Sequence, residues 1–583
     1  MLLERNDRVK LIKYLKPYRL FALLTPLAMV GEVMVDLMQP KLMSKIVDEG
    51  VLSQNMDVII HTGIFMFLLL LVGGSCGIAA SAFSGVASQG FARDLRVDTF
   101  KKVMDLSFEQ TDKFTTGSLV TRLTTDITAI QQVVDFCLRM LVRDTIMFFG
   151  GIIMMLTLNV KFGFVLVCAL PIEVVIMLII LKKASPYYKV VAEKIDDVNS
   201  VVQENVSGAR VVKAYVREDF EADRFNDANV RLMESNLKVQ KLVALLQPLL
   251  MIVLNLSVIA VILIGGFQVQ AKAMNVGEVM AAITYLTHIL NGVMMLSMMF
   301  QTVSKATASA RRIEEILETA PTINDGTDDF DNSQKGTVSF RNVSFSYPGT
   351  KGRPVISNFS LDIKSGENIA ILGATGSGKS SLVNLIPRFY DATNGDVYVD
   401  GKNVRDVSVE ELRKRIGIVL QKSELFSGTV SDNIRWGNDN ASADEIKTAA
   451  EIAQADEFIS KMPDGYNGII AEKGASLSGG QKQRLSVARA VAKRPEIIIF
   501  DDSTSALDLS TEAKLRHGLK QALSNATVIT IAQRIASIKD CDRIAVLDHG
   551  KLVACDSHEE LLKSCSVYKD IYSSQVKSTG GEK

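Results

Sequence analysis

Six long apolar stretches dominate the first half of the chain, and they constrain its fold more than any other feature. They lie at about 20–40, 58–83, 139–159, 162–182, 243–268 and 277–300. Each is long enough to cross a hydrocarbon core of about 30 Å as a helix. The sequence therefore predicts an α-helical membrane domain of six transmembrane helices over 20–319, preceded by an amphipathic interfacial helix at 1–19.

Basic residues near the ends of these stretches predict the orientation of the membrane domain. Two long polar connections, between spans two and three and between spans four and five, have helical periodicity. Lysines and arginines lie where these connections meet the membrane, at Arg93, Arg96, Lys101, Lys102, Lys182, Lys183 and Lys189. The positive-inside rule then places both connections and both termini on the cytoplasmic side of the cell membrane.

A phosphate-binding motif dominates the second half. Residues Gly373–Ser380 read GATGSGKS and fit G-x-x-x-x-G-K-[ST], the P-loop, which wraps backbone N–H groups around phosphate oxygens. We expect Lys379 to reach the β- and γ-phosphates of ATP and Ser380 to hold Mg²⁺. The residues predicted to contact ATP in this segment are Gly373, Thr375, Gly376, Ser377, Gly378, Lys379, Ser380 and Ser381.

Composition and periodicity place this motif in a second domain. An acidic segment containing Pro321 and Gly326 breaks the preceding helix, so we expect a linker at 320–335. Beyond it, strand-like and helix-like stretches alternate, which predicts an α/β nucleotide-binding domain over 336–583. The chain carries 65 basic and 65 acidic residues, so no affinity of the whole chain for nucleic acid is indicated.

Further positions around the P-loop suggest nucleotide contacts. Tyr347 follows a strand-like run, and its ring can stack on adenine. Gln421 also follows a strand-like run, so its amide can reach Mg²⁺ or a water beside the γ-phosphate. Asp501 ends a third such run and can hold the metal's water shell. The sequence LSGGQ opens a helical stretch and predicts a second anion-binding helix end, formed by Leu477, Ser478, Gly479, Gly480 and Gln481.

The P-loop, LSGGQ and Asp501, in this order behind six spans, resemble an ATP-binding cassette (ABC) exporter of the half-transporter type, with a type I arrangement of helices. The resemblance implies two halves whose nucleotide domains close head to tail, so that each ATP lies between one P-loop and the LSGGQ of the other half. It also implies that Tyr347 stacks on adenine and that Gln421 senses the γ-phosphate. The matching D-loop residues are Ser505, Ala506, Leu507 and Asp508.

Two positions depart from the family pattern. The family has a catalytic glutamate after the metal-binding aspartate, but this chain has Asp502, which is one methylene shorter. The family also has a histidine near the γ-phosphate, but this chain has Gln533, which cannot carry a positive charge. Both departures predict a site that binds ATP and hydrolyses it slowly. We therefore expect a non-identical partner half, whose competent site this chain's LSGGQ would complete.

The resemblance implies ATP-driven export of amphipathic or hydrophobic compounds of the multidrug type. Export of a peptide or a lipid, and a non-transporting ATP-dependent membrane sensor, are alternatives. Four residues within the spans mark a possible cargo cavity, namely Glu32, Asp36, Glu173 and Met298. Charged groups at this depth are costly, so the acidic residues either bind cationic cargo, line a water-filled passage or hydrogen-bond between helices. Met298 fits an adaptable apolar pocket and ordinary helix packing equally well.

Overall fold

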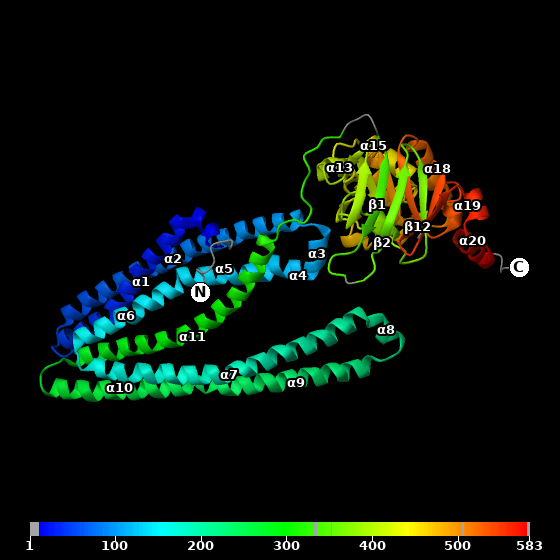
Figure 1. Ribbon diagram of the computed structural model, residues 1–583. Coiled ribbons are helices and arrows are strands. Elements are labelled where there is room, and N and C mark those ends of the chain that lie inside the picture. Colours follow the sequence, from blue (N-terminus) through cyan, green and yellow to red (C-terminus); the bar gives the residue numbers. More distant parts are fainter. Residues whose placement is uncertain (1–10, 331–334, 351, 504–506, 580–583) are drawn as a thin grey trace. The chain divides into compact units, whose positions relative to one another are not determined.

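The computed structural model describes residues 11–330, 335–350, 352–503 and 507–579, without the side chains of 294–301, 304, 509 and 576–579 (Figure 1). The chain divides into two compact units. The first comprises Met1–Met104 and Thr116–Thr319, and the second comprises Asp105–Thr115 and Ala320–Lys583. The short segment Asp105–Thr115 therefore belongs with the second unit, although it lies within the sequence of the first.

The first unit is helical wherever it forms regular structure in the described residues. Its elements are η1 (Leu11–Tyr18), α1 (Arg19–Lys45), η2 (Ile46–Val51), α2 (Met56–Asp105), α4 (Thr116–Thr121), η3 (Arg122–Asp126), α5 (Ile127–Leu138), α6 (Met140–Leu158), α7 (Phe162–Ser207), α8 (Ala209–Ala214), α9 (Glu218–Ala244), α10 (Leu246–Gln270) and α11 (Val276–Glu318). The long helices α7, α9 and α10 run alongside one another (Figure 1).

These helices have the length and surface of membrane spans. Five helical segments of the described residues are long and apolar enough to cross a membrane, at Leu11–Val51, Met56–Asp105, Thr116–Leu158, Phe162–Ser207 and Glu218–Gln270. The sixth predicted span lies in α11, part of which is outside the described side chains. Large apolar side chains such as Leu68, Phe164 and Leu256 are more than half exposed, which suits contact with lipid. The prediction of a helical membrane domain is confirmed.

Interhelical contacts join the ends of the bundle. The backbone N–H of Gly277 donates to Asp48 Oδ1 at 2.7 Å, so η2, which directly follows α1, meets the start of α11. At the other end of α11, Arg312 forms an ion pair with the buried Asp126 of η3. Arg122, also of η3, donates to the Arg312 carbonyl at 2.8 Å. Charged groups therefore link η3 to the last part of α11.

The second unit contains two main sheets. Within the described residues, a mixed six-stranded sheet has the order β12-β11-β3-β10-β9-β6, in which only the β11–β12 pair is antiparallel. An antiparallel four-stranded sheet has the order β2-β1-β4-β5. The strands are β1 (Val338–Phe345), β2 (Ile356–Ile363), β3 (Asn368–Leu372), β4 (Asn394–Val399), β5 (Lys402–Asn403), β6 (Ile416–Val419), β7 (Gly428–Thr429), β8 (Ile469–Ile470), β9 (Ile497–Asp501), β10 (Thr527–Ala532), β11 (Arg543–Asp548) and β12 (Lys551–Asp556).

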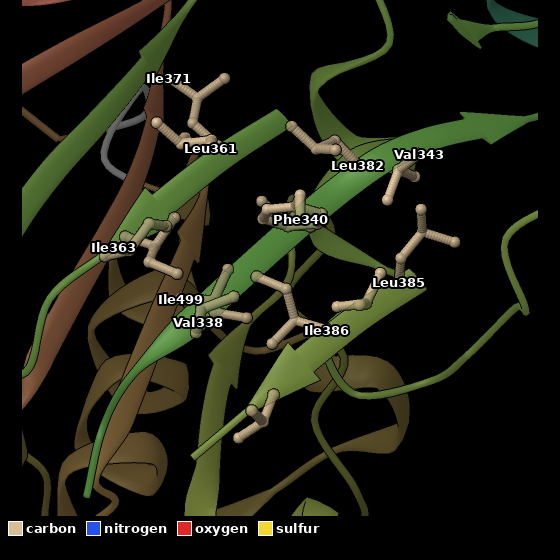
Figure 2. Close-up of a cluster of buried hydrophobic side chains, with 14 of the residues drawn as sticks. Val338, Phe340, Val343, Leu361, Ile363, Ile371, Leu382, Leu385, Ile386 and Ile499 are labelled. Carbon is tan, nitrogen blue, oxygen red and sulfur yellow. The ribbon is translucent and has the colours of Figure 1, made fainter. Parts of the chain in front are cut away.

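Helices accompany these sheets, and a shared apolar core holds the sheets together. The helices are α3 (Phe108–Phe114), α12 (Lys379–Val383), α13 (Val409–Arg415), α14 (Val430–Arg435), α15 (Ala443–Ile452), α16 (Asp456–Ile459), α17 (Gly479–Ala492), α18 (Leu509–Ala522), α19 (His558–Ser564) and α20 (Ser566–Thr579). Phe340 of β1 packs in one buried cluster with Ile371 of β3 and Leu382 of α12 (Figure 2). The strand that leads into the P-loop, β3, is therefore anchored in this core, and the α/β prediction is confirmed.

Helix α3 packs on the α/β core through aromatic side chains. The ring of Phe108 lies 4.5 Å from that of Phe389, and the Tyr390 hydroxyl donates to Asp112 at 2.9 Å. Helix α3 is therefore anchored on the core of the second unit, with which Asp105–Thr115 is grouped.

Candidate nucleotide site

The P-loop connects β3 to α12, as the sequence predicts. Gly376 and Gly378 have φ of +83° and +97°, conformations that side-chain-bearing residues rarely adopt. A Cβ on Gly378 would also lie 2.9 Å from the Val355 carbonyl oxygen. Glycine is therefore required at Gly378 by both backbone conformation and space.

Short hydrogen bonds hold the side chains that are predicted to contact the phosphates and the metal. Lys379 Nζ donates to the carbonyls of Gly373 and Ala374 at 2.8 and 2.9 Å. Burial lowers the pKa of Lys379, and the nearby Asp502 and Asp501 oppose that shift. The Ser380 hydroxyl donates to Asp501 Oδ1 at 2.8 Å. A hydroxyl paired with a carboxylate is an oxygen set that suits Mg²⁺, so the residues present fit the ion.

Burial raises the pKa of Asp501, while the Ser380 hydrogen bond counteracts the shift and Asp502 adds to it. A bound cation would favour the ionised form of this carboxyl, because opposite charge lowers a carboxyl pKa.

Ten of the thirteen positions predicted to contact ATP or the metal or to act in catalysis line one cavity of about 270 Å³. Its lining residues are Val355, Thr375, Gly376, Gly378, Lys379, Ser380, Ser381, Gln421, Asp501, Asp502, Ile531 and Gln533. The structure thus brings Gln421, Asp501 and both departures from the family pattern to the P-loop. Val355 and Ile531 are lining residues that the sequence analysis missed, because a single apolar residue carries no signal for a binding site.

The two departing residues contact each other directly. Gln533 Nε2 donates to Asp502 Oδ2 at 2.9 Å. Burial raises the pKa of Asp502, and Lys379 and Gln533 partly offset that rise. The carboxylate that would face the attacking water is therefore engaged by a neutral amide.

The C-terminal helix α20 contacts the same loop. Gln575 Nε2 donates to the Gln533 carbonyl at 2.7 Å, and Gln575 Oε1 accepts from the Ile535 N–H at 2.8 Å. These contacts hold the backbone that carries Gln533. Sequence reasoning missed Gln575, since a glutamine near a chain end has no distinguishing motif.

Tyr347 lies beside the P-loop helix and outside the lining of this cavity. Its hydroxyl hydrogen-bonds to that of Ser381 at 2.9 Å, and its ring meets Tyr390 edge-on at 5.4 Å. The LSGGQ segment also lies outside that lining. Ser478 begins α17 with a capping box, in which Ser478 N donates to Gln481 Oε1 at 2.8 Å.

Of the remaining predicted positions, some lie outside the described residues, one is buried and one caps a helix. Ser505 and Ala506 of the D-loop lie outside the described residues, as does the side chain of Met298. Leu507 is buried, while Asp508 begins α18 by accepting from the N–H groups of Ser510 and Thr511.

The acidic residues of the spans also differ in their surroundings. Glu32 and Asp36 both face Arg143 of α6, at 3.5 and 3.4 Å. Glu173 is buried in α7, and within the described residues its Oε2 has no hydrogen-bond partner. Glu32 and Asp36 therefore take part in contacts between α1 and α6, whereas Glu173 shows no such partner in the described part of the chain.

A helical membrane unit joined to a P-loop α/β unit defines the class of ATP-powered membrane transporters. The family of ABC transporter transmembrane regions matches residues 22–294, and the ABC transporter family matches 356–505. The chain belongs to the ABC transporters and is an exporter, so its α/β unit is an ATPase domain that binds ATP, normally with Mg²⁺.

Individual relatives extend over nearly the whole chain. The uncharacterized ABC transporter ATP-binding protein YfiB of Bacillus subtilis is 40% identical over 98% of this chain and 99% of its own length. The ATP-dependent lipid A-core flippase of Syntrophus aciditrophicus is 32% identical over 91% and 88%. The solved structure of a bacterial Atm1-family ABC exporter with ATP bound matches with a TM-score of 0.81 and 26% identity, over 96% of this chain and 98% of that one.

Proposed function

We propose that this chain is one half of a heterodimeric exporter of amphipathic or hydrophobic compounds, of the multidrug type, whose own ATP site hydrolyses slowly. The observation that carries the proposal is the hydrogen bond between Gln533 and Asp502. Both residues that depart from the family pattern thus lie together, in the cavity that also holds the P-loop lysine.

Binding and hydrolysis place different demands on this site. Lys379, Ser380 and Asp501 supply what ATP and Mg²⁺ need, because Lys379 would place a cation against the phosphates and the other two would give oxygen ligands to the metal. When bound, Mg²⁺ would neutralise charge on the phosphate oxygens. Hydrolysis also needs a carboxylate that orients the attacking water. Asp502 is short for that role and accepts from a neutral amide, so we expect slow water attack here.

The second half would carry the glutamate and histidine that this chain lacks. The LSGGQ segment of this chain fits the role of completing that competent site in trans. It lies outside this chain's own P-loop cavity, and a Cβ at Gly479 would meet nothing within 4 Å, so its backbone is accessible. ATP at both sites would join the two ATPase domains, and hydrolysis at the partner's site would reset the transporter in the cell membrane, with both termini cytoplasmic.

A lipid exporter is a second candidate, since one relative that spans most of this chain is a lipid A-core flippase. A non-transporting sensor remains the alternative outside transport. Reconstituted vesicles separate these functions: ATP-dependent accumulation of an amphipathic dye supports multidrug export, translocation of a labelled lipid alone supports the second candidate, and neither movement supports the sensor.

The heterodimer is tested by measuring ATP hydrolysis by the full chain alone and together with its co-expressed partner half. We expect slow hydrolysis alone and fast hydrolysis by the pair. In the pair, Ser478→Ala in this chain should lower the rate strongly, whereas Lys379→Ala should lower it less. The matched control is Ser442→Ala, which removes the same kind of helix cap from α15. Fast hydrolysis by the chain alone would refute the asymmetric assembly.

A further inference from the structure

A cavity of about 500 Å³ lies within the membrane unit, among α1, α2, α6 and α11. Its lining residues are Asp36, Gln39, Pro40, Met43, Met66, Arg143, Asp144, Met147, Thr284, His288, Asn291 and Gly292. The volume falls in the range of sites for drug-sized ligands, which is about 300–1,000 Å³. Only Asp36 among these residues was singled out by the sequence.

The cavity lies deep in the bundle. Asp36 lies nine residues before Lys45, the end of α1, which corresponds to roughly 14 Å along the helix axis. His288 lies twelve residues after Val276, the start of α11, or roughly 18 Å. The segment η2, which directly follows α1, meets the start of α11 at the contact between Asp48 and Gly277. The cavity therefore lies roughly 14 to 18 Å along the bundle from that contact, and Asp36, Arg143 and His288 fall within the predicted spans 20–40, 139–159 and 277–300.

Negative charge is in excess at this depth. The guanidinium of Arg143 faces two carboxylates, with Nη2 3.4 Å from Asp36 and Nε 3.5 Å from Glu32. Asp144 lines the same cavity and adds a third carboxylate. Among the described lining residues, Arg143 is the single lysine or arginine and His288 the single histidine, so these two groups together could not balance three carboxylates. Uncompensated charge at this depth is costly, and a cation in the cavity would reduce that cost.

The rest of the lining suits the apolar part of such a ligand. Met43, Met66 and Met147 contribute flexible, polarizable side chains, which adapt to ligands of different shapes. A phosphate or other anion fits less well, because the only guanidinium donors in the described lining already face Glu32 and Asp36. An anion would also lie beside the carboxylate of Asp144.

We propose that this cavity binds amphipathic organic cations, with the positive centre beside Asp144 and Asp36 and the apolar groups against the methionines. The inference rests on the proposed export function and specifies its class of cargo. It assigns the recognition of charge to Asp144, and it assigns to Arg143 the positioning of Glu32 and Asp36 on α1.

Two ions of nearly the same shape and opposite charge show which sign of ligand charge the cavity prefers. The full chain in lipid nanodiscs is titrated with radiolabelled tetraphenylphosphonium and with tetraphenylborate, and binding to empty nanodiscs is subtracted. We expect saturable binding of tetraphenylphosphonium that is about tenfold weaker in Asp144→Asn. Asp144→Glu keeps the charge and should restore most of the affinity. Asp196→Asn is the matched control, because Asp196 is exposed on α7 and does not line the cavity.

Three results overturn the proposal. The first is equal binding of the two ions. The second is preferred binding of tetraphenylborate, which would indicate an anionic occupant such as a lipid phosphate. The third is an equal loss of affinity in Asp144→Asn and Asp196→Asn. Thermal unfolding of each variant shows whether it is folded, and a poorly folded Asp144→Asn leaves the comparison of the two ions as the deciding measurement. Each of these results concerns cargo charge alone and leaves ATP-driven export standing, since export is measured separately in vesicles.

Discussion

Restoring the two family residues together, Asp502→Glu and Gln533→His, should turn a slow ATP site into a fast one. In the wild-type chain the Asp502 carboxylate accepts a hydrogen bond from Gln533 at 2.9 Å. Glutamate would carry its carboxylate one methylene further, roughly 1 to 1.5 Å. That is the distance by which we expect the present side chain to fall short of the attacking water.

The size of the effect follows from this distance. A positional error of about 1 Å at a reacting group costs about 100-fold in rate. A 100-fold gain corresponds to about 2.7 kcal/mol of transition-state stabilisation. The histidine would replace a neutral amide by a group that can carry positive charge beside the γ-phosphate, so the double variant should gain about 100-fold or more, and Gln533→His alone should gain less.

The assay uses the full chain in nanodiscs, under conditions where mass photometry shows a dimer. Phosphate release is measured at saturating ATP and Mg²⁺, and binding of a fluorescent ATP analogue is measured in parallel. Adding Lys379→Ala to the double variant is the control, because it should abolish the gained activity by removing the cation that faces the phosphates.

Two outcomes would refute the reasoning. The first is an unchanged hydrolysis rate in a double variant that still dimerises and binds the analogue normally. The second is a wild-type rate that already equals the rate of the double variant. In either case the bond between Gln533 and Asp502 would not limit hydrolysis.

Two further predictions concern contacts outside the ATP site. Tyr390→Phe removes the hydrogen bond to Asp112 and should lower the free energy of unfolding by about 1 kcal/mol, with little further loss when Asp112→Ala is added, as chemical denaturation of the single and double variants would show. Asp126→Asn removes the buried counter-charge of Arg312 and should cost about 2 kcal/mol, less than a fully buried pair because Arg312 is 49% exposed. Asp197→Asn, which breaks an exposed pair on α7, should leave thermal stability unchanged, and a loss equal to that of Asp126→Asn would contradict this account.

Motif spacing and long apolar stretches were sufficient to predict the class of fold, because a P-loop requires a strand, a turn and a helix in sequence. Periodicity also predicts strand β1, whose buried residues Val338 and Phe340 alternate with less buried ones. Contacts between distant segments could not be predicted from the sequence. Nothing in the sequence indicates that Arg143 faces the carboxylates of α1, or that Gln575 holds the loop of Gln533. Such pairs depend on helix rotation and packing, which a single sequence does not encode locally.

The membership of Asp105–Thr115 in the second unit has a mechanical consequence. The chain passes between the two units at three places, after Met104, after Thr115 and after Thr319. The ATPase unit is therefore joined to the membrane unit by three covalent connections and not by one linker. Thr115 ends α3 with φ of +56°, and α4 begins at the very next residue, which leaves little slack at that passage. A displacement of the ATPase unit would therefore be transmitted to the membrane unit through α2 and α4 as well as through the linker after Thr319.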